Sequence, residues 1–207
     1  MSNVITRSLV LLAVSTAIVL VSAFVAPPAS PSHTTAASTE QGETAGHDMS
    51  GMTMTVDSEE AFVTRMIPHH QEAVKSARAI LKTTERPEVR ELAQNVIATQ
   101  TEEIATLEGW RDQWYPDATE AAYTPMMADP TGLNPDKADR TFLKGMVEHH
   151  QGAIDMAQSY LDANYEKRGE VVQMAEAIVN AQTSEITQMQ GWLNEWYGGA
   201  GDDSGAH

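Results

Sequence analysis

The chain has 207 residues, a formal net charge of −16 and no cysteine. The acidic balance argues against a nucleic-acid partner, because phosphate groups are bound by Lys and Arg side chains. It also argues against adhesion to an anionic membrane surface, whereas it would concentrate cations near the protein. The lack of cysteine excludes disulfides, thiolate metal sites and a lipid-modified N-terminal cysteine, so a transition metal would need His, Met or carboxylate ligands.

The N-terminal quarter of the chain is predicted to lie outside the folded domain. Residues 8–26 are uncharged and mostly apolar, which is typical of a signal peptide or an uncleaved anchor, so residues 1–26 are interpreted as an export segment. Membrane contact is expected only through residues 8–26, and only if this segment is not cleaved. Residues 27–56 are rich in Pro, Ser, Thr and Gly and predict a flexible tether. The rest of the protein is therefore expected in an extracytoplasmic space: the periplasm, the cell surface or the medium.

The tether carries a cluster of soft metal ligands within eight residues. In a solvated linker, methionines have no packing reason to cluster. Thioethers are neutral and favour Cu(I) over zinc. The cluster is therefore a candidate site of metal capture, formed by His47, Met49, Met52 and Met54.

Four helices are predicted between residues 57 and 197, followed by a disordered tail over residues 198–207. A capping box of Asp57 and Glu60 marks the first start, and an Asn-Pro pair at residues 134–135 marks the third. Pro68 lies inside the first helix, where it is expected to kink the helix or make it restart. The expected spans are about 57–82, 87–115, 135–165 and 169–197.

The two helical pairs are copies of one another. The motif MIPHHQ at residues 66–71 returns as MVEHHQ 80 residues later, and a second matching block is offset by 82 residues. The repeats, 57–115 and 135–197, are helical hairpins joined by a long connection. This pattern predicts an all-α four-helix bundle of ferritin-like topology, with two hairpins in simple up-down order as the alternative.

Each copy of the motif brings soft and nitrogen ligands to one side of a helix. Positions i, i+3 and i+4 share a helical face, so a methionine and two histidines lie together on an otherwise apolar stripe. This mixed set of thioether and imidazole ligands suits copper. The candidate ligands are Met66, His69, His70, Met146, His149 and His150.

The second and fourth helices each carry one Gln and one Glu in an apolar stripe. A buried carboxylate is costly unless it is paired, and facing histidines would satisfy it. A carboxylate that accepts from the far nitrogen of a ligating histidine also orients that ligand. A polar network that only fixes the helix register is the alternative role for these four residues: Gln100, Glu103, Gln182 and Glu185.

At the two HHQ motifs the chain resembles the family called domain of unknown function 305. This resemblance extends over residues from about 57 to 197 and implies an exported bacterial protein with a ferritin-like bundle. It also implies copper binding or copper tolerance, which are associated with some members. The family motif often continues to a methionine six residues beyond the second histidine. That residue is Met156 in the second repeat, whereas the first has Ser76 beside Lys75, so the third helix is expected to contribute more to binding than the first.

The sequence thus predicts a non-enzymatic protein that buffers, scavenges or delivers copper, with Cu(I) favoured over Cu(II). A protein that exchanges copper with it would be its natural partner. A structural or partner-binding bundle, whose histidines merely complete a polar core, is the alternative. A di-iron or di-manganese oxidase is the weaker alternative, because the second and fourth helices contain no histidine and the chain has no Glu-x-x-His motif.

Overall fold

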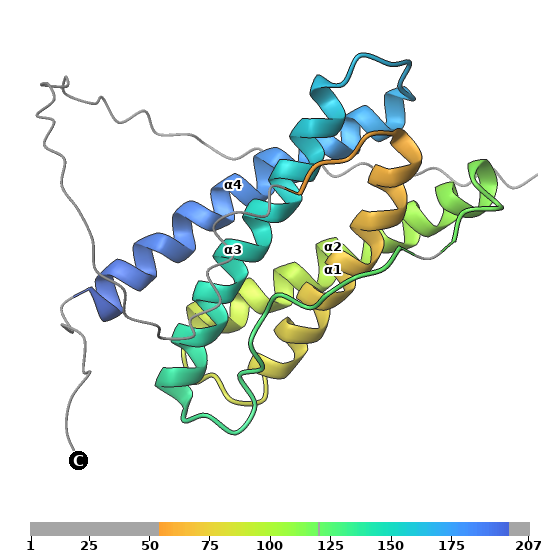
Figure 1. Cartoon of the computed structure of the whole chain (residues 1–207). Helices are drawn as coiled ribbons and strands as arrows, with labels where there is room; N and C mark the ends of the chain where they lie inside the picture. Colours follow the sequence, from red (N-terminus) through yellow and green to blue (C-terminus); the bar gives the residue numbers. More distant parts are fainter. Residues whose placement is uncertain (1–53, 120, 199–207) are drawn as a thin grey trace, which may run out of the picture. The chain divides into compact units, whose positions relative to one another are not determined.

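The computed structural model describes residues 54–119 and 121–198 (Figure 1). Within these ranges it contains helices and no strand, which confirms the predicted all-α fold. No helix in the described ranges combines the length and the hydropathy needed to cross a bilayer. The export segment, most of the tether and the tail from residue 199 lie outside the described residues. The helices are α1 (Glu59–Ile80), α2 (Pro87–Trp114), α3 (Pro135–Asp162) and α4 (Gly169–Tyr197).

Side-chain caps fix the starts of α1 and α3. The Asn134 side chain accepts a hydrogen bond from the backbone N–H of Lys137 at 2.9 Å, as the Asn-Pro pair predicted. At α1 the cap is Ser58, whose Oγ accepts from the backbone N–H three residues on at 3.1 Å. The prediction of Asp57 as the cap was wrong. Ser58 has the extended backbone of an N-cap residue, and two residues earlier the N–H of Val56 donates to Oγ of Ser159 on α3 at 2.8 Å.

Helix α1 passes through Pro68 without interruption, so the restart considered for this position does not occur. A proline has no N–H, and the carbonyl one turn earlier, on Thr64, therefore lacks its helical donor. Pro68 is itself buried in the bundle. Packing thus holds α1 as one helix across the position where its backbone ladder is incomplete.

The hairpins meet through their first helices. Helix α1 packs against α2 and α3 packs against α4, while α1 and α3 pack against each other (Figure 1). One apolar cluster joins the start of α1 and the end of α3, and the other joins the end of α1 and the start of α3, so these helices are antiparallel. Residues 115–134 therefore span the length of the bundle. This is the ferritin-like crossover, and the simple up-down order is wrong.

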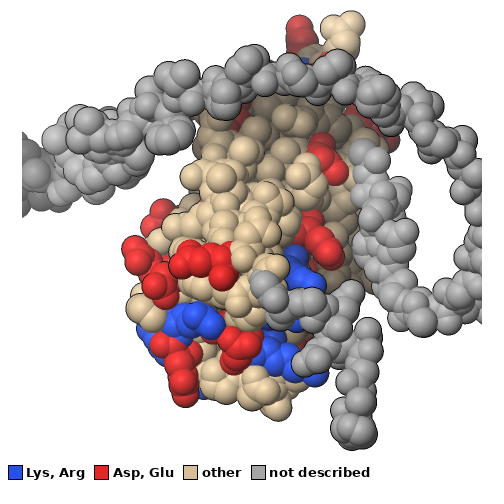
Figure 2. Space-filling view, turned by 90° about the vertical axis from the view of Figure 1, so that its left-hand side faces the viewer, with Lys and Arg blue, Asp and Glu red and all other residues tan. Residues whose placement is uncertain are grey.

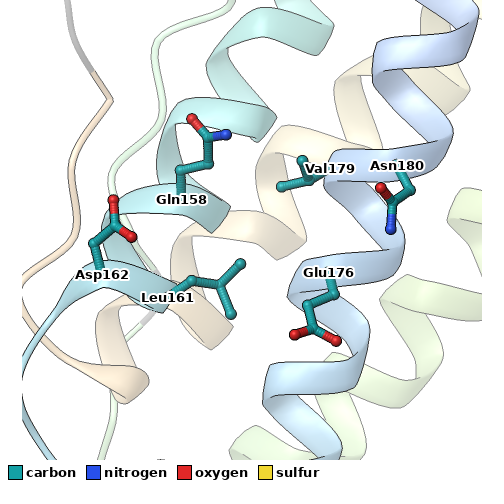
Figure 3. A pocket seen from close by; sticks show the side chains of 6 residues that line it. All are labelled: Gln158, Leu161, Asp162, Glu176, Val179 and Asn180. Carbon is teal, nitrogen blue, oxygen red and sulfur yellow. The ribbon is translucent and has the colours of Figure 1, made fainter.

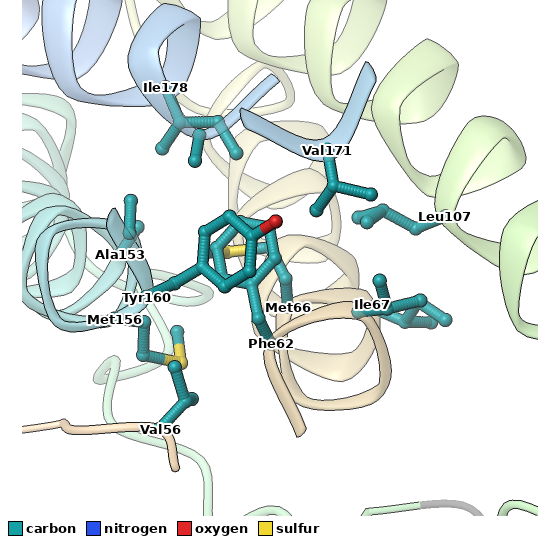
Figure 4. Packing of buried hydrophobic residues seen from close by; sticks show 13 residues of the cluster. Val56, Phe62, Met66, Ile67, Leu107, Ala153, Met156, Tyr160, Val171 and Ile178 are labelled. Atoms are coloured by element: carbon teal, nitrogen blue, oxygen red, sulfur yellow. The ribbon is translucent and has the colours of Figure 1, made fainter. Parts of the chain in front are cut away.

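The two apolar clusters fill opposite ends of the bundle. The Phe62 cluster has Phe62 stacked on Tyr160, with ring centroids 4.7 Å apart, among side chains from all four helices (Figure 4). The Phe142 cluster includes Ile80, Leu143 and Met189. A stacked tryptophan pair packs beside each cluster, at the end of α2 and at the end of α4. Between the clusters lies the middle of α1 and α3, which carries the HHQ motifs.

Charged side chains are unevenly distributed over the surface. In the face shown in Figure 2, acidic and basic side chains interleave at the lower end, and the upper part is largely uncharged. Helix α4 contributes no Lys or Arg to the surface. Acidic and basic side chains that alternate in this way are typical of a solvated surface, so this face has no cluster made of basic residues alone.

Candidate metal centre

Four histidines form a buried layer between the two apolar clusters. His69 and His70 come from α1, His149 and His150 come from α3, and none is more than 1% exposed. The rings of His69 and His149 face each other across the helix interface, with centroids 3.8 Å apart. The sequence left open whether the two motifs meet, and they meet through these two residues.

The outer histidine of each pair contacts a carboxylate of its own hairpin. Nε2 of His70 lies 2.9 Å from Oε2 of Glu103 on α2. Nε2 of His150 lies 2.6 Å from Oε2 of Glu185 on α4. The stripes of α2 and α4 thus place their carboxylates where the sequence analysis expected them. The nearby amides, Gln100 and Gln182, are also buried, but the Oε1 atom of each has no hydrogen-bond partner.

The inner histidine of α3 has polar neighbours that the sequence analysis missed. Oε2 of Glu72, on α1, lies 3.5 Å from Nε2 of His149 and accepts a hydrogen bond from the Tyr123 hydroxyl. That hydroxyl is also 3.5 Å from Nε2 of His149. Oε1 of Glu72 accepts from the backbone N–H groups of Met126 and Met127 at 2.8 and 2.9 Å. Glu72 therefore ties the crossover segment to α1 beside the histidine layer.

The inner histidine of α1 has a different environment. A Cβ atom built on Gly152 would lie 3.2 Å from Nε2 of His69, 3.0 Å from Sδ of Met54 and 3.9 Å from Cε of Met126. Two thioether side chains thus converge on the place where His69 meets α3. Neither ring nitrogen of His69 has a hydrogen-bond partner. Met126 was not among the predicted ligands, because it lies in the crossover and belongs to neither repeat.

Burial keeps the inner imidazoles neutral. It lowers the pKa of His69 well below the ordinary value of 6.5, and the positive charges that His149, His70 and His150 would carry lower it further. Burial likewise lowers the pKa of His149, followed by repulsion from His150 and His70. A neutral imidazole keeps a lone pair on one ring nitrogen, which is the form that binds metals.

The predicted methionine ligands are divided among three places. Met66 and Met156 are buried in the Phe62 cluster, and Met146 is buried in the Phe142 cluster. Their sulfurs thus have apolar neighbours on either side of the histidine layer. Met54 is the one tether ligand within the described residues, and it lies against Gly152. The other tether candidates, His47, Met49 and Met52, lie outside the described residues.

Nitrogen and carboxylate ligands alone do not form a complete site in the described part of the chain. No group of three or more His, Asp or Glu side chains there is arranged to hold a metal ion. The free ring nitrogens and the converging thioethers together make a softer donor set, of the kind that fits copper.

The surface hollow in Figure 3 lies apart from these donors. It has a volume of about 310 Å³ between the end of α3 and the first half of α4. Its two carboxylates, on Asp162 and Glu176, come from different helices, and the other lining side chains are neutral. Neither a histidine nor a methionine lines it, so it is not a candidate for the soft metal site.

Residues 59–193 match a family model described as domain of unknown function, DUF305. No curated protein matches the chain. Among solved structures, CopM in its Cu(I)-bound form is 34% identical over 69% of this chain and 99% of that chain, with a TM-score of 0.60. CopM also matches in Cu(II)-bound and Ag-bound forms.

Two DUF305 structures from named bacteria are similar to the chain. A protein of Streptomyces coelicolor, predicted to be secreted, is 29% identical over 67% of this chain and 93% of its own, with a TM-score of 0.59. A fragment from Deinococcus radiodurans is 31% identical over 66% of this chain and 95% of its own, with a TM-score of 0.58.

Proposed function

The chain belongs to the DUF305 family, and we propose that it is an extracytoplasmic, non-enzymatic protein that binds copper in order to buffer, scavenge or deliver it. In this proposal residues 1–26 direct export, residues 27–56 form a tether with soft ligands, and residues 57–197 form the metal-binding bundle. Copper is the cargo of the protein, and a protein that exchanges copper with it would be its partner.

The observation that carries the proposal is the buried layer of four imidazoles with unpartnered ring nitrogens. A buried polar atom without a partner is costly, and native proteins retain few of them. Nδ1 is unpartnered in all four histidines of the layer. Four such atoms at one level of a bundle are explained if they, or the nitrogens beside them, bind a metal ion.

The contact with Glu185 gives His150 a defined tautomer. If Nε2 of His150 carries the proton and donates it to Glu185, the lone pair is on Nδ1, which has no partner. Nε2 of His70 lies 2.9 Å from Oε2 of Glu103, but neither ring nitrogen of His70 makes a hydrogen bond, so its tautomer is not fixed by Glu103. A carboxylate partner also raises the basicity of a ligating imidazole, so Glu103 and Glu185 would strengthen metal binding from outside the site.

The comparisons support both the metal and the location. CopM has been solved with Cu(I), Cu(II) and silver, and silver is a soft monovalent ion like Cu(I). The Streptomyces relative is predicted to be secreted, in agreement with the apolar segment at residues 8–26. Cu(I) is favoured because the donors near the histidines include thioethers, and Cu(II) remains the second state to test.

Copper titration under competition from a chelator tests the proposal. We expect the full chain to retain Cu(I), and the double variant His69→Ala/His149→Ala to lose at least about tenfold in affinity, since both inner imidazoles are removed. Gln71→Ala is the matched control, because this exposed residue adjoins the histidine pair on α1. Equal affinities in all three proteins would show that the histidine layer does not bind copper.

Thermal unfolding distinguishes the structural alternative. An ion that binds only the native state stabilises it by mass action, so copper should raise the melting temperature of the full chain and of Gln71→Ala. A melting temperature that does not respond to copper would leave the histidines with a purely structural role, next to Glu103 and Glu185.

A further inference from the structure

The two inner histidines have non-equivalent surroundings at equivalent positions. Glu72 follows His69 by three residues on α1, and Gly152 follows His149 by three residues on α3. Glu72 reaches across to His149, whereas Gly152 leaves an opening beside His69. The repeat therefore places a carboxylate next to one inner imidazole and a gap next to the other.

Two methionine side chains from outside the helices reach that gap, one with its sulfur and the other with its methyl group. Sδ of Met54 and Nε2 of His69 would both lie within 3.2 Å of a Cβ atom at Gly152, and the methyl group of Met126 would lie 3.9 Å from it. A Cβ atom at position 152 would be in tight contact with both the sulfur and the ring nitrogen, and each would have to shift to make room for it. Glycine thus keeps open the space in which the imidazole and the thioethers meet.

Both methionines are held in place by hydrogen bonds of their own segments. The backbone N–H of Met126 donates to Glu72 at 2.8 Å. Two residues after Met54, the N–H of Val56 donates to Ser159 on α3 at 2.8 Å, and the carbonyl of Thr55 accepts from Arg65 on α1 at 3.1 Å. The thioethers are therefore delivered by anchored backbone, which lowers the entropy lost when they bind an ion.

We propose that His69, Met54 and Met126 form a binding site for a soft monovalent cation, Cu(I), with Nε2 of His69 and the two sulfurs as ligands. The assignment rests on the proposed function and names the part of the histidine layer that holds the ion. All three ligands are neutral, so a monovalent ion keeps its single charge in the site. A divalent ion would leave more charge uncompensated in this buried position, which favours Cu(I) and Ag(I) over Cu(II) and zinc.

The two inner histidines contribute unequally to the site. The carboxylate beside His149 belongs to Glu72 and already has hydrogen-bond partners. Glu72 accepts from the Tyr123 hydroxyl and from two backbone amides of the crossover. Glu72 thus holds the backbone of Met126 in position through one of these hydrogen bonds. The proposal thereby reverses the expectation from the resemblance that α3 contributes more to binding than α1.

Replacement of each thioether by a similar hydrocarbon tests the site. We would use the full chain with Met49→Leu and Met52→Leu as the parent, so that these two tether thioethers do not contribute. Met54→Leu and Met126→Leu are then added singly, since exchanges between Met and Leu disturb packing little. Met127→Leu is the matched control, because Met127 neighbours Met126 but packs against Gly145, with its Cε 3.4 Å from a Cβ atom built there.

Affinity for Cu(I) is measured under reducing conditions against a chromogenic chelator, and Ag(I) serves as the redox-inert probe. We expect Met54→Leu and Met126→Leu to weaken Cu(I) binding at least about tenfold and Met127→Leu to leave it unchanged. In NMR spectra of methyl-labelled methionine, Ag(I) should shift the methyl signals of Met54 and Met126 more than that of Met127. Thermal unfolding of the metal-free variants checks that each one is folded.

Two contrary results have different meanings. If the parent binds Cu(I) and both Leu variants bind it equally tightly, this site is wrong while copper binding by the bundle stands. If neither the parent nor the unaltered chain retains Cu(I) against the chelator, copper binding itself is wrong, and the site falls with it.

Discussion

Each end of the bundle contains a buried carboxylate, at equivalent positions of the repeat. The two carboxylates differ in how many hydrogen bonds they accept. At one end, Glu59 accepts hydrogen bonds from the hydroxyls of Tyr115 and Tyr160 at 2.9 and 2.7 Å. It also accepts from the backbone N–H of Arg168 at 2.8 Å and from its guanidinium. Every oxygen of this carboxylate is engaged, and the four donors come from three different parts of the chain.

At the other end the equivalent carboxylate is Asp139. Nε of Arg86 lies 3.4 Å from its Oδ2, and its Oδ1 has no hydrogen-bond partner. The guanidinium of Arg86 is instead bonded to Asp136 at 2.9 Å. The position equivalent to Tyr160 is Ile80, which has no hydroxyl. The acid at this end has the shorter side chain of aspartate, and the tyrosine hydroxyl of the first end has no counterpart. The carboxylate of Asp139 is therefore incompletely paired.

Because of this difference in pairing, the pKa values of Glu59 and Asp139 are shifted in opposite directions. Burial by itself raises the pKa of Glu59, but hydrogen bonds from Arg168, Tyr160 and Tyr115 outweigh it, and the net pKa is lowered from 4.5. Burial also raises the pKa of Asp139, where the Thr84 hydroxyl and the Arg86 charge offset it only in part. The pairing of a buried acid, more than its burial, therefore decides whether its charge stabilises the fold.

The largest effect is expected from Glu59→Gln, which breaks the well-paired end. Loss of the charge weakens the bonds that Glu59 accepts from both tyrosines and from Arg168, so the free energy of unfolding at pH 7 should fall by about 2–3 kcal/mol. Because the folded pKa is lowered, the carboxylate stabilises the fold above its unfolded pKa and loses this effect as pH falls through the folded value. Urea unfolding from pH 7 to pH 3 should show the difference from the unaltered protein shrinking. A difference that persists at pH 3 would contradict the role of the charge.

A smaller effect is expected from Tyr160→Phe, which makes the first end resemble the second. The ring still stacks on Phe62, while Glu59 loses the hydrogen bond of 2.7 Å from the phenol. One hydrogen bond to a charged group contributes about 1.5–3 kcal/mol, and three other donors remain, so we expect a loss near 1.5 kcal/mol in urea unfolding. The matched control is Tyr165→Phe, since the Tyr165 hydroxyl has no hydrogen-bond partner. Equal losses in the two variants would mean that the bond to Glu59 is unimportant.

The sequence predicted the elements of this fold because they depend on local periodicity. The apolar stripes of the HHQ motifs placed all four histidines inside the bundle. The mid-helix carboxylates of α2 and α4 predicted facing histidines without saying which, and the structure shows that these are His70 and His150. The repeat predicted two equivalent hairpins. The length of the connection between them favoured the crossover topology that the structure contains.

The missed residues are those whose contacts depend on tertiary structure. Glu72 and Tyr123 meet beside His149 only because the crossover folds back over α1, and no local pattern predicts that path. Met126 is delivered by the same segment. The divergence between Glu72 and Gly152 was visible in the repeat, but only the packing of α1 on α3 indicates that each faces the opposite histidine.

The smallest effect, and one of opposite sign, is expected from Asp139→Asn at the incompletely paired end. Since the folded pKa of Asp139 is raised above its ordinary value of 3.8, the ionised form destabilises the fold at neutral pH, and this penalty disappears as pH falls below the unfolded pKa. Asparagine has a similar shape and no charge, and Arg86 keeps its bond to Asp136 and its contact with the Trp196 ring at 4.3 Å. We therefore expect the variant to be more stable than the unaltered protein at pH 7, by less than about 1 kcal/mol. The gain should vanish near pH 3 in the same urea series. A loss of stability at pH 7 comparable to that of Glu59→Gln would mean that the two ends are equally well paired, and the contrast between them would then have to be abandoned.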